Sequence, residues 1–407
     1  MTVLTSKIQN PKSKIQNPKL IMLHHHRAQF PALANKIYFN YGGQGPMPQG
    51  AMDAITQSQA HIQEIGPFGT EAYGWISPQM QATKQAIASE LNVTPDTITL
   101  TGNVTIGCNI GMWGIDWQPG DAMLLSDCEH PGVIATAGEI SRRFGVEVST
   151  CPLIATLNEG DPASIIAENL RPNTRLVVLS HVLWNTGQVL PIDKIADICR
   201  NNNSLLLVDA AQSVGVLPLN LAELGVDFYA FTGHKWLCGP AGVGGLYVRR
   251  EAREKLQPTF IGLNGVITND QAQPINWQPD SRRYEVSTLA TPLYISLREA
   301  IATHNQWGTP EERYQQICQN SAYLWHQLTN LPNVKCLKNS PPQSGLVSFQ
   351  LTNNQPNTKL VQFLESQKIL TRIIANPNCI RVSVHYLTLE SEIDQLIAAI
   401  EDFCHIK

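Results

Sequence analysis

Two short apolar runs, each closed by a reactive side chain, restrict the fold of this 407-residue chain more than any other feature. Residues 205–208 are apolar and are followed directly by Asp209, and residues 226–231 lead into the turn that carries Lys235. Apolar runs of this length between polar residues are typical of strands buried on both faces of a parallel sheet. We therefore expect both side chains at the carboxyl edge of such a sheet, where open α/β proteins bind ligands.

An acid and a lysine in this arrangement indicate pyridoxal 5'-phosphate (PLP) as the cofactor. Desolvation lowers the pKa of a lysine beside a buried strand, which leaves a free amine able to form a Schiff base. A carboxylate at Asp209 would keep the pyridine nitrogen protonated, and only then does PLP act as an electron sink. Gln212 lies three residues further on and is placed to reach the ring hydroxyl. A surface helix cap and a surface lysine are the alternative for either residue alone.

Several segments give the chain a resemblance to a known family. With VDAAQS (208–213) and AFTGHKW (230–236), the chain resembles the class V aminotransferases, the PLP fold type I group that includes cysteine desulfurases. It is most similar to the carbon–sulfur lyase branch of that family, from about Arg27 to the C-terminus. Further segments that carry the resemblance are YFNYGGQG (38–45), GNVTIGCN (102–109), DCEHPG (127–132), LWNTGQVLP (183–191) and GPAGVGGLY (239–247).

The resemblance implies an α/β fold with two domains of unequal size. Residues 45–299 are expected to form a large PLP-binding domain, with a mostly parallel seven-stranded sheet between helices. Residues 300–407 are expected to form a smaller α+β domain, because long helical patterns alternate there with short strands. Residues 27–44 are expected to join this smaller domain. The family also implies a homodimer with its active sites at the interface.

The first 26 residues have a different character. The heptapeptide SKIQNPK occurs twice in succession, and the segment is basic and rich in Pro and Asn. Such a composition has little to bury, so we expect residues 1–26 to be disordered. Met22 is a candidate translation start. Three adjacent histidines, residues 24–26, lack a carboxylate or cysteine partner nearby, so we expect no metal site there.

Composition limits the partners and the compartment. The formal charge is −4, from 29 basic and 33 acidic residues. This balance argues against nucleic acid or an anionic membrane as the main partner. No apolar run reaches the roughly 18 residues that a membrane span needs. Nine cysteines without regular spacing are typical of core thiols in a reducing compartment, so we expect the cytoplasm.

A turn between the strand at residues 97–100 and the next helix is a candidate phosphate site. It contains Asn103, Val104 and Thr105, and it would place free N–H groups at the positive end of the helix dipole. The pattern alone is weak, because Asn and Thr cap many helices that bind nothing. The resemblance implies that this turn holds the cofactor phosphate, together with Thr232 and His234.

Three further cofactor contacts are implied by the family. His130 follows the strand at residues 122–125, where a histidine often only begins a helix. The resemblance makes it the aromatic platform over the pyridine ring, with a pKa suited to proton transfer. Asn185 would contact the ring hydroxyl or the substrate, unless it is a simple turn residue. Thr288 would reach across the dimer interface to the phosphate of the neighbouring subunit.

The substrate contacts are expected at Gly43, Arg372 and Arg381. Gly43 lies in a glycine-rich turn that lets backbone approach a ligand. A guanidinium group suits a carboxylate, and we expect Arg372 to be the principal clamp. Leu263 stands where the resembling lyases have a tryptophan, which leaves the natural substrate open.

The reaction predicted from these residues is β-elimination on L-cystine or L-cysteine, which gives pyruvate, ammonia and cysteine persulfide or sulfide. A cysteine desulfurase supplying sulfur for iron–sulfur clusters is the first alternative, and an aminotransferase is the second. Desulfurases carry a catalytic cysteine on a mobile loop between the two arginine positions, but here these lie nine residues apart. Cys379 lies between them and is predicted to begin a strand. A glycine-rich segment at 239–245 leads into a strand and not into a helix, which excludes a dinucleotide fingerprint.

Overall fold

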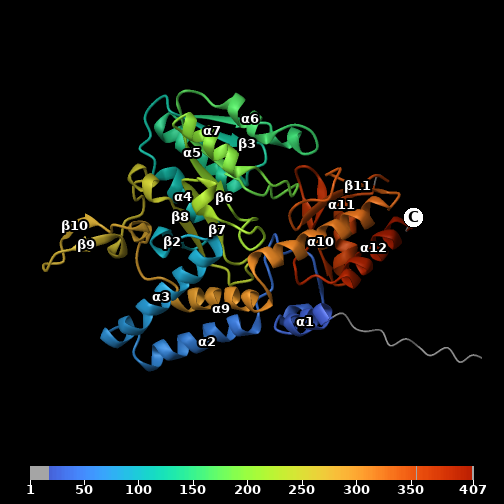
Figure 1. The fold of residues 1–407 in the computed structure, drawn as a ribbon, viewed down its shortest axis with the longest axis horizontal. Helices are drawn as coiled ribbons and strands as arrows, with labels where there is room; N and C mark the ends of the chain where they lie inside the picture. The colour runs from blue at the N-terminus through green and yellow to red at the C-terminus, as the bar shows by residue number, and fades with distance from the viewer. Residues whose placement is uncertain (1–17, 354, 406–407) are drawn as a thin grey trace, which may run out of the picture.

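The computed structural model describes residues 18–353 and 355–405. Its centre is a seven-stranded sheet of order β2-β8-β7-β6-β5-β3-β4 (Figure 1). Within this sheet only β8 runs opposite to the other six strands, so the predicted, mostly parallel sheet is confirmed. The strands are β2 (Ile98–Thr101), β3 (Ala122–Ser126), β4 (Glu147–Cys151), β5 (Thr174–Ser180), β6 (Leu205–Asp209), β7 (Phe228–Thr232) and β8 (Gly244–Val248).

Alternate residues of the buried strands supply two separate cores. In β6, Leu206 and Val208 pack into one apolar cluster, whereas Leu205 and Leu207 pack into another. Since successive side chains of a strand point to opposite faces, helices must cover both sides of the sheet. The covering helices are α4 (Val104–Trp113), α5 (Pro131–Phe144), α6 (Pro162–Asn169), α7 (Ile192–Asn201) and α8 (Leu221–Leu224).

Three longer helices lie against each other beside the sheet. They are α2 (Gln49–Glu64), α3 (Thr70–Leu91) and α9 (Thr291–Trp307), and α9 packs on both of the others. After Gly308 the chain enters α10 (Pro310–Thr329), whose first turn is closed by a capping box between Thr309 and Glu312. Figure 1 shows α10 leading away from the large sheet toward the C-terminus.

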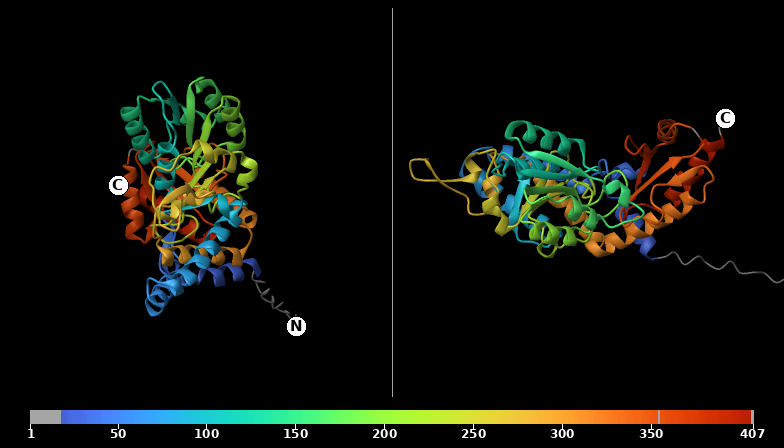
Figure 2. Two further views of the ribbon diagram at one scale, coloured as in Figure 1. Left: turned by 90° about the vertical axis from the view of Figure 1, so that its left-hand side faces the viewer. Right: turned by 90° about the horizontal axis from the view of Figure 1, so that it is seen from above.

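The C-terminal domain is a four-stranded antiparallel sheet backed by helices (Figures 1 and 2). Its strand order is β11-β12-β15-β14, and a short parallel pair, β1-β13, joins the N-terminal segment to this domain. The predicted smaller α+β domain is therefore present. Its elements are β1 (Ile37–Tyr38), β11 (Val334–Cys336), β12 (Leu346–Leu351), α11 (Asn357–Ser366), β13 (Ile369–Leu370), β14 (Arg372–Ile374), β15 (Cys379–Ser383) and α12 (Glu390–His405).

The N-terminal segment differs from its prediction. Residues 18–27 form helix α1 (Pro18–Arg27), so the expected disorder of residues 1–26 is wrong for 18–26, while 1–17 lie outside the described residues. His26 is buried, and its Nε2 lies 3.0 Å from the hydroxyl of Tyr386. Arg27 forms a buried ion pair with Glu392 at 2.7 Å. The histidines are thus not in a flexible tail, because the C-terminal domain provides polar partners that hold α1.

A hairpin of β9 (Val266–Thr268) and β10 (Pro274–Trp277) was not predicted. It projects from the molecule on the side opposite the C-terminal domain (Figures 1 and 2). Among residues 18–353 and 355–405, no helix is both long and apolar enough to cross a membrane. The same residues contain no group of three or more His, Cys, Asp or Glu side chains arranged to hold a metal ion.

Candidate active site

A cavity of about 330 Å³ opens where the carboxyl ends of the parallel strands face the C-terminal domain. It combines residues from the turns after the strands with residues of β14 and β15. Most of the predicted site residues meet here, although they come from distant parts of the chain. The lining residues are Gly42, Gly43, Asn103, Val104, Thr105, His130, Ser180, Val182, Trp184, Asp209, Ala211, Gln212, His234, Lys235, Arg372 and Arg381.

Lys235 and Asp209 form the ionisable pair of the cavity. Asp209 is the last residue of β6, and its Oδ1 accepts a hydrogen bond from the N–H of Ala211 at 2.9 Å. Burial raises the pKa of Asp209, while this N–H and the charge of Lys235 act in the opposite direction. Burial lowers the pKa of Lys235 to about 8, against the opposing effect of Asp209. Near neutral pH a useful fraction of this lysine is therefore a free amine.

Gln212 connects the floor of the cavity to the glycine-rich turn. Its Nε2 donates to the carbonyl of Gly42 at 2.9 Å, and its Oε1 accepts from the indole N–H of Trp236 at 2.8 Å. The N–H of Gly45 donates to the carbonyl of His234 at 2.8 Å. These bonds hold the turn against the segment that carries Lys235, so the turn forms one wall of the cavity.

The predicted phosphate turn has the geometry of an anion site. The side chain of Asn103 caps α4 by accepting from the N–H of Ile106 at 3.0 Å. Val104 and Thr105 begin the helix and line the cavity, where N–H groups of a first turn lack intrahelical partners. His234 lines the same cavity, and its Nδ1 lies 2.7 Å from Oγ1 of Thr232. Thr232 itself is buried behind His234, so it positions that ring.

His130 has two roles that the sequence presented as alternatives. It caps α5, because its Nδ1 accepts from the N–H of Gly132 at 3.2 Å. It also lines the cavity, with its ring edge-on to Trp184 at a centroid distance of 6.0 Å. Burial lowers the pKa of His130, which the charge of Asp209 partly offsets. The hydrogen bond from the N–H of Gly132 thus holds the ring at the cavity wall, and the lowered pKa favours its neutral form.

The two arginines differ strongly in their surroundings. Arg381 is 1% exposed, whereas Arg372, its register partner across β14 and β15, is exposed. The Nη1 of Arg381 donates to the carbonyl of Trp184 at 2.7 Å, but its buried Nε and Nη2 have no hydrogen-bond partner in the part of the chain that the structure describes. Burial lowers the pKa of Arg381 to about 9. A buried guanidinium group with two unpaired nitrogen atoms, and with no carboxylate partner among the described residues, suits an anionic ligand.

Asn185 and Thr288 do not line this cavity. Asn185 is buried beside it, where its Nδ2 donates to the carbonyl of Asn376 at 3.3 Å. Thr288 is exposed at the surface. Thr288 therefore does not reach the cavity of its own subunit.

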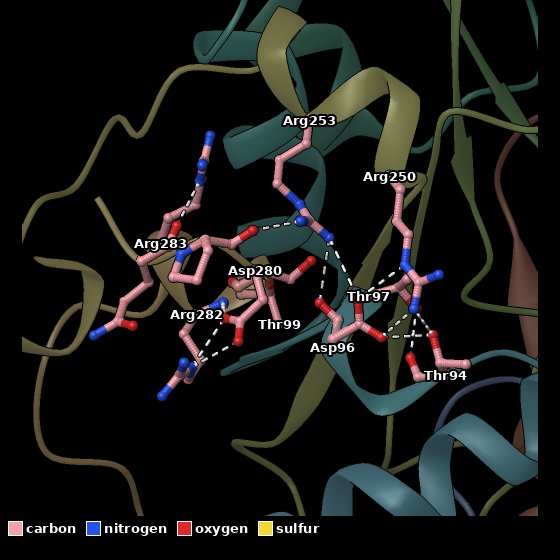
Figure 3. Close-up of polar contacts among 12 residues, drawn as sticks. Thr94, Asp96, Thr97, Thr99, Arg250, Arg253, Asp280, Arg282 and Arg283 are labelled. Atoms are coloured by element: carbon pink, nitrogen blue, oxygen red, sulfur yellow. Dashed lines mark hydrogen bonds and ion pairs between the residues drawn. The ribbon is translucent and has the colours of Figure 1, made fainter. Parts of the chain in front are cut away.

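The segment before Thr288 is fastened to the large domain by a network of polar contacts (Figure 3). Arg253 donates to the carbonyl of Pro279 at 2.5 Å and lies 3.7 Å from Asp96. Arg250 forms an ion pair with the same aspartate at 2.8 Å. Further along, buried Glu285 accepts from the N–H of Leu100 and pairs with Lys84 at 2.7 Å. These contacts present Thr288 at the surface in a defined position.

Five lining residues were not among the predicted site residues. Ser180 ends β5, and Val182 and Trp184 follow it, while Gly42 and Ala211 each adjoin a predicted residue. The segment LWNTGQVLP carries part of the family resemblance, and the sequence predicts Asn185 from it but not Trp184. Within that segment, only the fold shows which side chain faces the cavity.

Fold and site together define a PLP-dependent enzyme of fold type I, and comparisons identify the family. The family model for class V aminotransferases matches residues 37–396, so the chain belongs to this family. Class V aminotransferases use PLP, as the sequence predicted.

Structures and curated relatives of known name agree with this assignment. The cystine C–S lyase C-DES, solved with its reaction product cysteine persulfide, is 49% identical, has a TM-score of 0.90, and matches 92% of this chain and 99% of its own. A lysine-to-alanine variant of C-DES carries glycine covalently linked to its PLP cofactor. Isopenicillin N epimerase of Streptomyces clavuligerus is 27% identical over 90% of this chain and 94% of its own length. A probable cysteine desulfurase of Methanothermobacter thermautotrophicus is 25% identical over 92% of this chain and 96% of its own length.

The described residues fit the cofactor. The N–H groups of Val104 and Thr105 at the start of α4 suit its phosphate, a buried carboxylate suits its pyridine nitrogen, and a lysine of lowered pKa suits its aldehyde. Arg381 takes no part in this fit, because it lies on β15, on the C-terminal side of the cavity.

Proposed function

We propose that this protein is a carbon–sulfur lyase that catalyses β-elimination on L-cystine, with L-cysteine as a second substrate. One L-cystine and one water would give pyruvate, ammonia and cysteine persulfide. The observation that carries the proposal is the absence of a cysteine among the described residues that line the cavity. Without a thiol there, the sulfur leaves with the product and is not transferred to the protein.

Cys379 is the cysteine that a desulfurase mechanism would require, and its surroundings do not suit that role. It is the first residue of β15, is 0% exposed, and its Sγ lies 4.0 Å from the carbonyl of Asn185. Burial raises its pKa to about 11, so the thiolate form is scarce at neutral pH. A thiol held in a strand cannot travel to a substrate and away again.

Each residue of the cavity would have its own role in the reaction. Bound PLP supplies the electron sink that accepts charge from the α-carbon. Lys235 would remove the α-proton as a free amine, and Asp209 would provide the negative charge that keeps the ring nitrogen protonated. His130 would lie against the ring of the bound cofactor, while the N–H groups of residues 103–105 and the side chain of His234 would hold its phosphate. A persulfide leaves readily because its pKa is low.

We propose Arg381, and not Arg372, as the principal clamp for the substrate carboxylate. This revises the sequence-based expectation, and the support is the difference in burial and in free donors between the two guanidinium groups. A desolvated fork binds a carboxylate more strongly than a fork that is already solvated. Arg372 would contribute positive charge at the mouth of the cavity, and Gly43 would let the substrate approach the turn.

The test is a product assay with purified, PLP-loaded protein and L-cystine. We expect pyruvate and ammonia in equal amounts, with cysteine persulfide as the third product and no need for a keto acid. Alanine as the amino-acid product would favour a desulfurase, whereas dependence on an added keto acid would favour an aminotransferase. Lys235→Ala is the control and should give no pyruvate above background.

We infer that the active unit is a homodimer in which Thr288 binds the phosphate of the neighbouring subunit. The support is that Thr288 is exposed on a segment held in place by polar contacts, and that several large apolar side chains of residues 260–286 are exposed as well. Phe260, Leu263 and Val286 are 61%, 71% and 43% exposed, and Ile275 of the hairpin is 62% exposed. A second copy of the chain would cover these residues.

Mixed dimers test this arrangement directly. Lys235→Ala and Thr288→Val homodimers should both be impaired. A heterodimer of the two would contain one intact site, formed by Lys235 of one chain and Thr288 of the other. Recovery of activity on mixing supports the contribution of Thr288 to the neighbouring site, and no recovery in a verified heterodimer contradicts it.

We also propose a reducing, cytoplasmic location for the protein. The support is its nine free cysteines, and localisation of a tagged protein would test it.

A further inference from the structure

A second carboxyl group lies buried under the cavity and has no role in the reaction proposed above. Glu129 is 3% exposed and lies between β3 and β5. Its Oε1 accepts from Oγ of Ser126 at 2.5 Å and from the N–H of Ser180 at 3.2 Å, and its Oε2 lies 2.8 Å from Oγ of Ser180. None of the ion pairs formed by residues 18–353 and 355–405 includes it. A buried carboxylate without a cation is costly, so its charge state needs an explanation.

Glu129 and Asp209 lie at the same edge of the sheet. Ser180, which binds Glu129, is the register partner of Asp209 in the β5–β6 pair. The negative charge of Asp209 acts on Glu129, and burial raises the pKa of Glu129 to about 7. Two ionised carboxylates at this edge would repel each other, whereas one proton on Glu129 leaves a single charge.

The other titratable groups that face Glu129 remain neutral. They are three thiols, from α4, from β4 and from its own turn, and burial raises the pKa of each. The pKa rises to about 12 for Cys128 and Cys151, and well above its usual value for Cys108. No cation among these neighbours offsets the charge of an ionised Glu129.

We propose that Glu129 is a positioning residue that carries a proton in the resting enzyme, so that Asp209 is the single negative charge beneath the ring of the bound cofactor. Its hydrogen bonds hold the ends of β3 and β5 beside Asp209. The proton passes to water as the pH rises through about 7, and a second charge then appears next to Asp209. The proposal rests on the role proposed for Asp209, but not on the identity of the substrate.

The first test is infrared spectroscopy of the full-length, PLP-loaded protein. Glu129→Gln keeps a side chain of the same shape that can still accept from Ser126 and Ser180. We expect wild-type protein to show the carbonyl band of a buried protonated carboxyl group, which fades as the pH rises through about 7 and is missing in Glu129→Gln. Asp127→Asn, which removes an exposed carboxyl group two residues away, should keep the band. A spectrum without any such band in wild-type protein at pH 6 would overturn the proposal.

The second test is thermal unfolding of the same proteins between pH 5 and pH 8. The folded-state pKa of Glu129 is raised to about 7, above about 4.3 in the unfolded chain. The folded protein therefore holds the extra proton between these values, and its stability falls as the pH rises through this window. The unfolding midpoint of wild-type protein should fall relative to that of Glu129→Gln up to pH 7 and run parallel above it. Parallel curves throughout would contradict a titrating Glu129.

The third test asks whether Glu129 acts through Asp209. The absorbance of the bound cofactor should show a step near pH 7 in wild-type protein, and this step should be missing in Glu129→Gln. Ser180→Ala removes a hydrogen bond that favours the ionised form, so it should move the step to higher pH. A step that persists in Glu129→Gln would refute the coupling, even if the protein fails to cleave L-cystine. Conversely, if only the lyase assay fails, all three tests can still be interpreted, because none of them requires turnover of L-cystine.

Discussion

The two sides of the cavity are built on different principles. On the side of the large domain, the key residues lie at strand ends. Asp209 is the last residue of β6, and Lys235 and the turn at residues 103–105 follow β7 and β2 within a few residues. On the side of the C-terminal domain, Arg372 and Arg381 lie on neighbouring antiparallel strands and meet the cavity only through the packing of the two domains. The first side is fixed by local chain geometry and fits the cofactor. The second is fixed by long-range contacts and is where the substrate would be selected.

The largest expected effect is on the cofactor side. Lys235→Ala should reduce turnover of L-cystine about 10⁴-fold, because it removes the base that takes the α-proton. The exposed Lys194→Ala on α7 is the matched control and should leave turnover unchanged. Steady-state rates of pyruvate formation measure both. A loss of less than tenfold in Lys235→Ala would mean that another group takes the proton.

The next effect separates the two arginines of the substrate side. Arg381→Lys should lower kcat/KM for L-cystine about 100-fold, because a single ammonium cannot replace a buried two-donor fork. Arg372→Lys keeps a positive charge at an exposed position and should cost at most about tenfold. Initial-rate kinetics on both variants give the comparison. The reverse ranking would restore Arg372 as the principal clamp.

A pH measurement tests whether the two sides are electrostatically coupled through Lys235. Asp209 raises the pKa of Lys235, whereas Arg381 lowers it. If the free amine captures PLP, the rate at which cofactor-free protein rebinds PLP should rise with pH and level off above about 8. The midpoint should move to lower pH in Asp209→Asn and to higher pH in Arg381→Met. A shift in the same direction for both variants would contradict the coupling.

The smallest effect concerns the glycine-rich turn. A Cβ added at Gly42 would lie 2.9 Å from Nη2 of Arg381 and 3.0 Å from Oε1 of Gln212, so the arginine must move slightly. We expect Gly42→Ala to raise KM for L-cystine about fivefold, since mild overpacking costs about 1 kcal/mol. The exposed Gly50→Ala on α2 has open space for a Cβ and should behave as wild type. An effect confined to kcat would show that the turn acts on the cofactor and not on the arginine.

This contrast also explains which features the sequence could predict. The strand ends that carry Asp209 and Lys235, the turn at residues 103–105, and the start of β15 at Cys379 are local patterns, and the structure has them where they were expected. The burial of Arg381 depends on contacts between β15 and Trp184, which no local pattern reveals. Helix α1 is held by Tyr386 and Glu392, more than 350 residues away, so its composition suggested disorder instead.

Glu129 shows the same limit within the best-predicted region. It precedes His130 directly, yet a carboxyl group in a polar turn looks like a surface residue in the sequence. Its burial follows from the parallel pairing of β3 with β5, which places Ser180 above it. In each of these cases the type of a residue predicts the chemistry of its side chain, whereas its burial, which the sequence does not show, decides its role in the folded protein.

The measurement that tests the central claim most directly is the fate of sulfur in a Cys379→Ala variant. PLP-loaded variant and wild-type protein would be incubated with L-cystine, and pyruvate and protein-bound persulfide measured in the same samples. The structure predicts equal pyruvate formation by both proteins and no persulfide on Cys379, because this thiol is buried in β15 and does not line the cavity. Loss of activity in the variant, with a persulfide on Cys379 in wild-type protein, would contradict the lyase and establish a desulfurase.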